Sequence, residues 1–514
     1  MRRILSITFL IILISGLNEA VAQNPNNALL YSHQAVQFGD QGSANDPISL
    51  IMPGTAFMSG LGSFIDNPAS MALHKNGSAE FGLSFRGVEE DATYLGQSRV
   101  IDDRQNNVSN FGFLYAFPTV QGSFVIGAGY TQHTAFNRAI GFQGRNNNSS
   151  ITDKFKADGS PYQDIAFDTF STDYGDGFED WDESIFRIGF NNFGDFLGIR
   201  QQGEIIQNGY SGEYSIYFAT ELQKDLMVGA SLGILSGRFN YTRIFQEIDE
   251  FNEYDSPDFI DSSGDGQGDT DIDRITLDDQ LQSRYAGFRA RVGALYQING
   301  KVSVGASYSF PTKIEVDEIF NANITSRFDN GTEFSASTDS EFTYELRYPS
   351  RLSIGLGLKD ISGFSVSLST EYTNYSTATI DFQESTLFES ELVENDFIND
   401  SYRAVWNIRA GVSYDLSKDL TLRGGYSYLP SKLLDGNDHR SVFAAGAGFS
   451  VTDNIRFEVA AQFTNWDETS AVYDYAEYDY SRLPDNPPGV SFRSEEADRT
   501  VNRVNLLGTV RVKL

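Results

Sequence analysis

The chain has 514 residues, with 70 acidic and 38 basic side chains and a formal net charge of −32. This acidity argues against a nucleic-acid-binding protein, because few cations are present to neutralise phosphates. The absence of cysteine excludes a lipoprotein anchor, disulfide bonds and thiolate chemistry.

The N-terminus carries the parts of an export signal. Arg2 and Arg3 precede an apolar run from Ile4 to Ile14, and Ala20-Val21-Ala22 is an A-x-A cleavage site. We therefore predict a signal peptide over residues 1–22. The alternative is an uncleaved anchor helix, for which the apolar run is short. No later stretch is apolar enough for a membrane helix, so strands are expected to make any membrane crossing.

Residues 23–78 differ from everything that follows them. They are rich in glycine, contain apolar runs at 48–52 and 56–61, and end in Asp66-Asn67-Pro68-Ala69. This segment is too apolar for a disordered tail and too short for a domain of its own. It can be stable as a plug inside the fold formed by the rest of the chain. The alternative is a periplasmic extension.

From residue 79 onward, apolar and polar side chains alternate. The period of two is clear in 364–369, in 455–463 and in 503–514 at the C-terminus. A strand with one apolar and one polar face separates two solvents, and in an exported chain these are lipid outside and a polar lumen inside. The pattern is typical of a transmembrane β-barrel.

Short polar turns group these strands into hairpins. The six turns lie at 118–122, 223–225, 299–300, 359–363, 417–419 and 452–454. With a first strand at Ala79–Arg86 and a last strand at Val501–Leu514, the hairpins give fourteen strands. We predict an all-β fold, a 14-stranded antiparallel transmembrane β-barrel over residues 79–514.

Longer acidic segments join the strands at the other end, roughly at 133–210, 247–282, 385–400 and 467–499. Short turns at one end and long loops at the other are typical of outer-membrane barrels, so these segments are predicted to be extracellular. Between Glu247 and Gln282 there are thirteen acidic residues and one basic residue. Solvated surface loops are the simplest explanation of this charge.

The longest of these loops contains a group of apolar side chains that could bind a ligand. They could line a capture groove, or they could pack the loop onto the rim of the barrel. The candidate ligand-binding residues are Phe136, Phe142, Phe190, Phe193, Phe196 and Leu197.

The acidic segment also contains a candidate calcium loop. Asp261, Asp265, Asp269 and Asp271 alternate with glycine and serine, and oxygen ligands around a glycine turn suit Ca²⁺. An EF-hand would have an acid in place of Ser263 and a glutamate in place of Ile272. A solvated acidic loop is the alternative.

No catalytic constellation is present in the sequence. The four histidines are scattered without the spacing of metal ligands, and neither a G-x-S-x-G elbow nor a phosphate-binding glycine loop occurs. We do not expect an enzyme or a resident cofactor other than the possible calcium ion.

Several motifs resemble the outer-membrane long-chain fatty acid transporter family of the FadL/TodX type. The motif Asn67-Pro68-Ala69 lies just before the first strand, followed by 79–85 as that strand. Further motifs that carry the resemblance are Gly293-Ala294-Leu295-Tyr296, Tyr348-Pro349, Thr370-Glu371-Tyr372-Thr373-Asn374-Tyr375-Ser376, and Leu422-Arg423-Gly424-Gly425-Tyr426-Ser427-Tyr428-Leu429-Pro430-Ser431. Their order covers essentially the whole mature chain, although the loops are longer and more charged than is usual in the family.

The resemblance implies passive uptake of hydrophobic molecules, long-chain fatty acids first and hydrocarbons next. It implies a hatch over 23–78 in which Asn67, Pro68 and Ala69 take part; the alternative for these three residues is a simple turn. It also implies lateral exit at the third strand, where Gly127, Gly129 and Tyr130 lie. The two glycines could permit a gap in the wall or could simply allow close packing.

The implied partners are hydrophobic small molecules, outer-membrane lipid and the barrel assembly machinery, with the protein acting as a monomer. The alternative function is a plugged outer-membrane barrel with a structural or adhesive role, in which the acidic loops make the contacts. An open porin is third, because residues 23–78 would obstruct it.

Overall fold

The computed structural model describes residues 29–40, 45–57, 60–157, 159–175, 178–187, 196–254, 265, 268, 270–479 and 489–514. The predicted signal peptide lies outside these residues. No helix in the described ranges is long and apolar enough to span a membrane.

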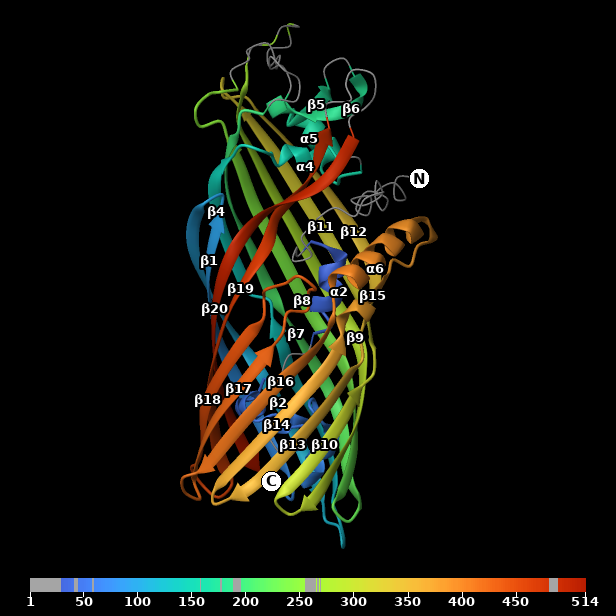
Figure 1. The fold of residues 1–514 in the computed structure, drawn as a ribbon, viewed down its shortest axis with the longest axis vertical. Helices are drawn as coiled ribbons and strands as arrows, with labels where there is room; N and C mark the ends of the chain where they lie inside the picture. The colour runs from blue at the N-terminus through green and yellow to red at the C-terminus, as the bar shows by residue number, and fades with distance from the viewer. Residues whose placement is uncertain are drawn as a thin grey trace.

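Eighteen strand segments form one antiparallel sheet that closes on itself (Figure 1). The sheet closes where β1 pairs with β20, from Ser78↔Lys513 to Thr93↔Asp498. The segments are β1 (Ser78–Tyr94), β2 (Gln97–Phe117), β3 (Phe124–Ala135), β4 (Arg138–Asn146), β7 (Ile199–Gln223), β8 (Leu226–Ile248), β9 (Ile272–Asn299), β10 (Val302–Ser309), β11 (Thr312–Phe328), β12 (Glu333–Tyr348), β13 (Arg351–Ile361), β14 (Phe364–Asn374), β15 (Thr379–Asp381), β16 (Ala404–Asp415), β17 (Leu420–Leu429), β18 (Arg440–Ser450), β19 (Ile455–Asp479) and β20 (Gly489–Lys513).

Four barrel strands are each built from two segments in line. β3 and β4 both pair with β7, and β10 and β11 both pair with β9. On the next strand, β12 pairs with β11 and β13 pairs with β10. On the strand after that, β15 pairs with β12 and β14 pairs with β13. The eighteen segments therefore make fourteen strands, and the predicted 14-stranded antiparallel barrel is confirmed.

The strands differ greatly in length, which gives the barrel one tall side and one short side. β9 has 28 residues and β19 has 25, whereas β17 has 10. In this description, the upper end is the end at which the long strands project in Figure 1, and the lower end carries the short turns and the C-terminus.

Two of the predicted long loops contain long stretches of barrel strand, so their predicted bounds are wrong. Residues 138–146 pair with 199–207 as β4 and β7, and residues 467–479 pair with 489–500 as β19 and β20. β8 and β9 likewise reach into the predicted loop 247–282. These strand ends carry polar side chains outward, as at Asp467, so they lack the apolar stripe that marks a strand in lipid.

The predicted loop at 385–400 mostly forms a helix, α6 (Phe388–Ser401), beside the short strands. Two connections at the upper end are short turns, Leu95-Gly96 between β1 and β2 and 329–332 between β11 and β12. The asymmetry between the two ends is therefore real but weaker than predicted.

A belt of apolar side chains surrounds the lower half of the barrel. Its members lie on outward-facing positions close to the lower turns, and they include Phe81, Phe85, Phe113, Ile216, Phe218, Ile234, Val292, Ile354, Leu368, Val412, Leu422, Phe443, Val459, Phe463 and Leu506. Higher on the same strands the outward side chains are polar, for example Asp91, Asp102 and Asp317. Such a belt is the lipid-facing surface of a membrane barrel.

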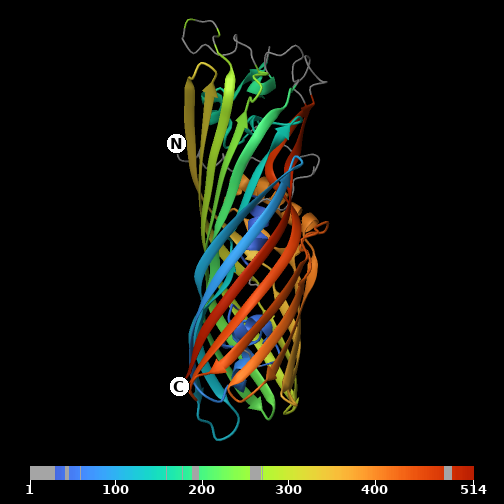
Figure 2. The same cartoon turned by 90° about the vertical axis from the view of Figure 1, so that its left-hand side faces the viewer.

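The described residues between 29 and 77 run through the interior of the barrel, and we call them the lumenal segment (Figure 2). Their helices are α2 (Tyr31–Gln37), α3 (Pro47–Ile51), η2 (Leu61–Phe64) and η3 (Pro68–Leu73). Wall glycines make room for the backbone: a Cβ on Gly305 would lie 2.0 Å from the Thr55 carbonyl oxygen, and one on Gly411 would lie 2.2 Å from that of Ile51. The main chain of the segment therefore packs directly against the barrel wall.

Residues between β4 and β7 form a small cap at the upper end. It contains α4 (Thr152–Phe155), α5 (Gln163–Asp168), β5 (Thr172–Gly175), β6 (Phe178–Ser184) and η4 (Ile185–Arg187). Its buried Tyr162 packs on Phe320 of β11 at 5.9 Å between ring centroids and donates a hydrogen bond of 2.6 Å to Asp279 of β9. The remaining short helices are η5 (Tyr375–Thr377) and η6 (Ser385–Leu387).

Candidate ligand cavity and wall opening

Asn67, Pro68 and Ala69 fasten η3 to the barrel wall. The Asn67 side chain accepts a hydrogen bond from Ala69 N at 2.9 Å and donates to the carbonyl oxygens of Thr55 and Ala294 at 2.7 and 3.0 Å. It thus caps the helix and ties it both to the lumenal segment and to β9. Two wall glycines, Gly229 and Gly293, lie directly against Pro68 and Asn67.

The third barrel strand is paired with β2 over only part of its length. β2 and β3 pair from Asn110↔Thr131 to Phe117↔Phe124, whereas β2 and β1 pair from Leu114↔Ser78 to Gln97↔Tyr94. Above Asn110, β2 has no strand partner on its β3–β4 side, and β4 pairs only with β7; all of these residues are within the described ranges. A bulge in β3 between Gln132 and Thr134 marks the point where the strands separate.

Side chains fill this opening between β2 and β4. Arg99 of β2 lies against Gly141 of β4, and Leu95 lies against Gly144. The Arg86 guanidinium donates a hydrogen bond of 3.1 Å to the Ala135 carbonyl oxygen just above the bulge. The opening is thus closed by movable side chains instead of a backbone ladder.

The predicted lateral-exit residues lie just below this opening. Gly127 and Gly129 are in the paired part of β3, with Gly129 opposite Gly112 and Gly127 beneath the Tyr217 ring. Tyr130 stacks on Phe111 with ring centroids 5.4 Å apart. The glycines permit close packing in the wall, and the bulge itself is at His133, which the sequence did not single out.

A buried charge cluster lies behind the bulge. Glu213 of β7 accepts hydrogen bonds from Arg291 at 2.7 Å through both oxygens and from Arg289 at 3.3 Å, and it lies 3.2 Å from His133 Nε2. Arg289 also donates to the Gly39 carbonyl oxygen at 2.8 Å. The cluster therefore connects the bulge, the wall and the lumenal segment.

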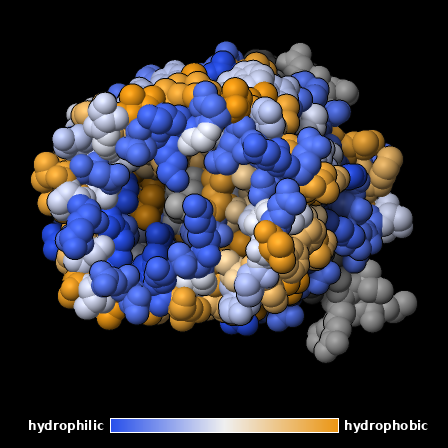
Figure 3. All heavy atoms as spheres, turned by 90° about the horizontal axis from the view of Figure 1, so that it is seen from below, coloured by the Kyte–Doolittle hydropathy of each residue, from blue (hydrophilic) through white to orange (hydrophobic). Residues whose placement is uncertain are grey.

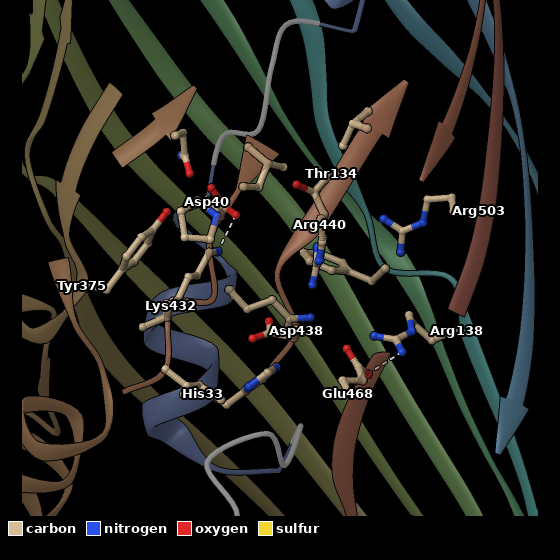
Figure 4. Close-up of a pocket in the computed structure, with 18 of the residues that line it drawn as sticks. His33, Asp40, Thr134, Arg138, Tyr375, Lys432, Asp438, Arg440, Glu468 and Arg503 are labelled. Carbon is tan, nitrogen blue, oxygen red and sulfur yellow. Dashed lines mark hydrogen bonds and ion pairs between the residues drawn. The ribbon is translucent and has the colours of Figure 1, made fainter. Parts of the chain in front are cut away.

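A cavity of about 240 Å³ lies in the lumen beside α2 (Figure 4). Arg138, Arg440, Arg503 and Glu468 line one side, and Asp40, Lys432 and Tyr375 line the other. Its apolar lining comes from Val36, Phe136, Ile140, Ile205, Leu429 and Val442. Polar groups and an apolar surface thus line the same cavity.

Most arginines near this cavity are paired with carboxylates. Arg138 contacts Glu90 at 2.7 Å and Glu468 at 2.6 Å. Arg499 contacts Glu468 at 3.0 Å and also pairs with Glu90. Arg409 and Lys432 pair with Asp66 and Asp40 of the lumenal segment at 2.9 and 2.6 Å.

Arg440 and Arg503 differ, because in the described part of the chain neither has a carboxylate within ion-pair distance. Both lie over the Trp466 ring, with Cζ atoms 4.5 and 4.9 Å from its centroid, and Arg138 lies over the same ring at 5.5 Å. The Arg503 Nε is buried without a hydrogen-bond partner. A tryptophan flanked by two unpaired guanidinium groups is suited to bind an anion.

Sequence reasoning missed this cluster. Arg499 and Arg503 lie on the same inward face of β20, but Arg499 falls just outside the predicted strand 501–514. The alternation of inward and outward side chains continues above Val501. Extending the predicted strand in that direction would have placed both arginines on its inward face.

Of the four candidate ligand-binding residues that the structure describes, only Phe136 lines the cavity. Phe142 is fully buried between Tyr94 and Phe245 in the upper core. Phe196 packs beneath Arg187 at 4.8 Å, and Leu197 is 45% exposed beside it. Phe190 and Phe193 lie outside the described residues.

The candidate calcium loop is only partly described. Asp261 and Asp269 lie outside the described residues, and Asp271 accepts a hydrogen bond from Ile272 N at 2.7 Å. Among the described residues, which include Asp265 and Asp271, no group of three or more possible ligands could hold a metal ion. Calcium binding stays a prediction.

A buried carboxyl group joins α6 to the lumenal segment. Glu394 of α6 is 2% exposed and lies against Ser32 of α2. Burial raises the pKa of Glu394 to about 7. This carboxyl group is therefore half protonated near neutral pH.

Comparisons with known proteins agree with this architecture. The family described as "Outer membrane protein transport protein (OMPP1/FadL/TodX)" matches residues 218–483. The crystal structure of the P. putida toluene transporter TodX matches over 92% of this chain and 99% of its own, at 13% identity and a TM-score of 0.50. That similarity shows the fold alone.

Two further structures match with lower scores. A Pseudomonas aeruginosa FadL homologue covers 92% of this chain and 98% of its own, at 10% identity and a TM-score of 0.48. The Ralstonia pickettii toluene transporter TbuX covers 93% and 100%, at 16% identity and a TM-score of 0.46. Among curated protein sequences, none matches this chain.

Proposed function

This chain belongs to the outer membrane protein transport family (OMPP1/FadL/TodX), and from that premise we propose that it takes up long-chain fatty acids across the outer membrane. The family and the barrel make it an outer-membrane transport protein for hydrophobic compounds, and the family is one of channels instead of enzymes. Fatty acids are the first proposed substrates, and aromatic or other hydrocarbons are second.

The single observation that carries this choice is the unpaired pair Arg440 and Arg503 beside Trp466. Both arginines are partly buried, and the Arg503 Nε is fully buried without a hydrogen-bond partner, which is costly; a carboxylate between the two would supply the missing acceptor. A hydrocarbon offers no such acceptor. The site therefore favours an amphiphile with an anionic head over a neutral aromatic ligand.

The apolar lining supports the same class of substrate. Val36, Phe136 and Ile140 lie in the cavity together with the arginines. Burial of an acyl chain contributes about 0.8 kcal/mol per methylene, so the tail supplies most of the affinity and the arginines supply the preference for an acid.

We propose that the lumenal segment is a hatch and that the ligand leaves through the opening between β2 and β4. The segment lines the cavity through α2 and continues down through the lumen, where Asn67 holds it to the wall, so it must move or be bypassed before a ligand can pass. The opening lies where the outward side chains change from Phe111 and Val108 to Arg104 and Asp102, at the upper edge of the apolar belt. A hydrophobic ligand leaving there enters lipid without crossing the aqueous periplasm.

The alternative is a plugged barrel with a structural or adhesive role. The upper half of the wall, with polar outward side chains on β9, β11, β19 and β20, projects well above the apolar belt and supports such a role. Both the transport function and the structural or adhesive role place the upper end of the barrel outside the cell.

The test is uptake of radiolabelled oleate by cells that express the protein. The Arg440→Gln/Arg503→Gln variant should bind oleate about tenfold more weakly in the purified state and take it up more slowly, because two charge-assisted hydrogen bonds are lost. A matched control is Arg104→Gln/Arg347→Gln, which changes the net charge equally at two exposed outward positions. No uptake and no oleate binding by the wild type would reject the transport proposal and favour the surface role.

A further inference from the structure

A second cavity, of about 470 Å³, lies at the lower end of the barrel beneath the lumenal segment. Seen from this end, a hollow mouth is ringed mainly by hydrophilic residues (Figure 3). We call this cavity the vestibule. Its volume lies in the range of small-molecule sites, about 300–1,000 Å³, and is far too small for a folded partner.

The rim of the vestibule is cationic although the protein is strongly acidic. Three hairpins each contribute a lysine in or beside the turn, namely Lys301, Lys359 and Lys418. Lys301 and Lys359 have no carboxylate within ion-pair distance among the described residues, and Lys418 has only a contact of 4.0 Å to its neighbour Asp419. In a chain with 70 acidic and 38 basic residues, such a grouping focuses a positive potential on one mouth.

The walls above the lysines add three guanidinium groups that are only partly neutralised, because they share two carboxylates. Arg423 and Arg456 contact Glu458 at 2.6 and 2.7 Å, and Arg511 pairs with Glu80. The lining also includes five hydroxyl side chains, those of Ser303, Ser365, Ser413, Ser417 and Thr421. The lining thus carries an excess of positive charge on its walls and at the lysine rim, and among the described residues that form it Asp415 is the one carboxylate besides Glu458.

The roof of the vestibule is apolar and belongs to the lumenal segment. It is formed by Ile48, Met52, Ala56, Phe57 and Leu73. Phe57 and Leu73 are only partly buried, so they offer surface to an occupant. From roof to rim the lining therefore changes from apolar, through hydroxyl groups, to cationic.

We propose that the vestibule binds a single-chain amphiphile with an anionic head, its tail against the Phe57–Leu73 roof and its head at Lys301 and Lys359. The head can be the carboxylate of a fatty acid or the phosphate of a lipid, because both present the same charge to the lysines. This site is separate from the Arg440–Arg503 cavity, and it does not depend on the proposed transport. It gives the lower mouth a ligand of its own.

The test uses the absence of native cysteine, which allows one reporter per variant. Ser413→Cys places an environment-sensitive dye in the vestibule, and Ser427→Cys places the same dye in the upper cavity. Each labelled full-length protein, held in nanodiscs of zwitterionic lipid, is titrated with dodecanoate, dodecyl phosphate and dodecanol. Retarded migration of the heated against the unheated protein in gels verifies that every variant is folded.

We expect the Ser413→Cys reporter to respond to dodecanoate or dodecyl phosphate at lower concentration than to dodecanol. The change Lys301→Gln/Lys359→Gln should weaken anion binding there by about tenfold, because two attractive charges are lost. The matched control Lys224→Gln, in a turn at the same end but outside the cavity lining, should leave it unchanged. A response to dodecanoate alone assigns a fatty acid, and one to dodecyl phosphate alone assigns a lipid phosphate.

Equal responses to dodecanol and the anions, or equal binding by the two-lysine variant and the wild type, would overturn the vestibule proposal. The Ser427→Cys reporter separates this outcome from failure of the proposed function. A silent upper reporter with a responsive vestibule rejects the fatty acid cavity alone, and the reverse result rejects the vestibule alone.

Discussion

The lower and upper halves of this barrel share strands but differ in what fills the lumen and what faces outward. Below, wall glycines such as Gly305 and Gly411 meet the main chain of the lumenal segment, and the outer face is apolar. Above, arginine and glutamate side chains such as Arg138 and Glu468 fill the interior, and the outer face is polar. The same alternation of inward and outward side chains therefore continues from the membrane-spanning lower half into the water-exposed upper half. Only the change of the outward residues from apolar to polar marks the boundary between them.

The largest effect is expected at the boundary of the two halves. Glu213→Ala leaves the buried guanidinium groups of Arg289 and Arg291 without their carboxylate. The loss should cost about 3–5 kcal/mol, because breaking a buried ion pair leaves an uncompensated charge. Urea unfolding in lipid vesicles, followed by tryptophan fluorescence, measures it.

The control for this prediction is Glu315→Ala, which removes an exposed outward carboxylate from β11. Equal stability of the two variants would mean that the halves do not depend on the Glu213 cluster.

The next effect tests the main-chain contact in the lower half. In Gly305→Val the new Cβ would lie 2.0 Å from the Thr55 carbonyl oxygen, so the lumenal segment must shift. Overpacking of this kind costs about 1–3 kcal/mol. We expect a lower stability and a higher ion conductance in planar bilayers.

Gly424→Val is the matched control, because a Cβ there meets nothing within 4 Å. Unchanged conductance in Gly305→Val would show that the segment does not obstruct the pore.

A smaller effect is expected at the anchor of the lumenal segment. Asn67→Ala removes the cap of η3 and the hydrogen bonds to Thr55 and Ala294, at a cost of about 1–2 kcal/mol. Hydrogen exchange should rise in residues 60–73, and oleate uptake should change, while barrel assembly stays normal. Pro68→Ala should act in the same direction.

The control here is Asn106→Ala on the exposed face of β2. If a correctly folded Asn67→Ala variant shows the oleate uptake and the hydrogen exchange of the wild type, Asn67 has no role in the proposed hatch.

A further test of the upper half uses pH. Because burial raises the pKa of Glu394 to about 7, the folded state holds this proton more tightly than the unfolded chain does. Its stabilisation is complete below the ordinary glutamate pKa of about 4.3 and is lost as pH rises through about 7. Hydrogen exchange of α2 and α6, corrected for intrinsic rates, should therefore show less protection at pH 8 than at pH 5.

Glu394→Gln should remove most of this pH dependence, since glutamine stays neutral. Glu391→Gln, on a more exposed face of α6, should retain it. The same pH dependence in both variants would assign the effect to another group.

The same contrast explains what the sequence could predict. The lower strands were readable because Val459 and Phe463 alternate with inward polar residues in a lipid-facing pattern. The upper ends of β19 and β20 were mistaken for a loop because Asp467 replaces the apolar stripe. The arginine cavity could not be assembled at all, since Arg138, Arg440 and Arg503 come from three strands far apart in the chain.

The partial pairing of β2 has a mechanical consequence. The seam where the two chain ends meet, between β1 and β20, has 16 residue pairs, whereas the seam between β2 and β3 has eight. Under heat or lateral tension, a cylinder of this kind splits along a short seam before a long one. The β16–β17 seam also has eight pairs, so the first tear should appear at β2–β3 or at β16–β17, and the closure that joins the two chain ends should outlast it.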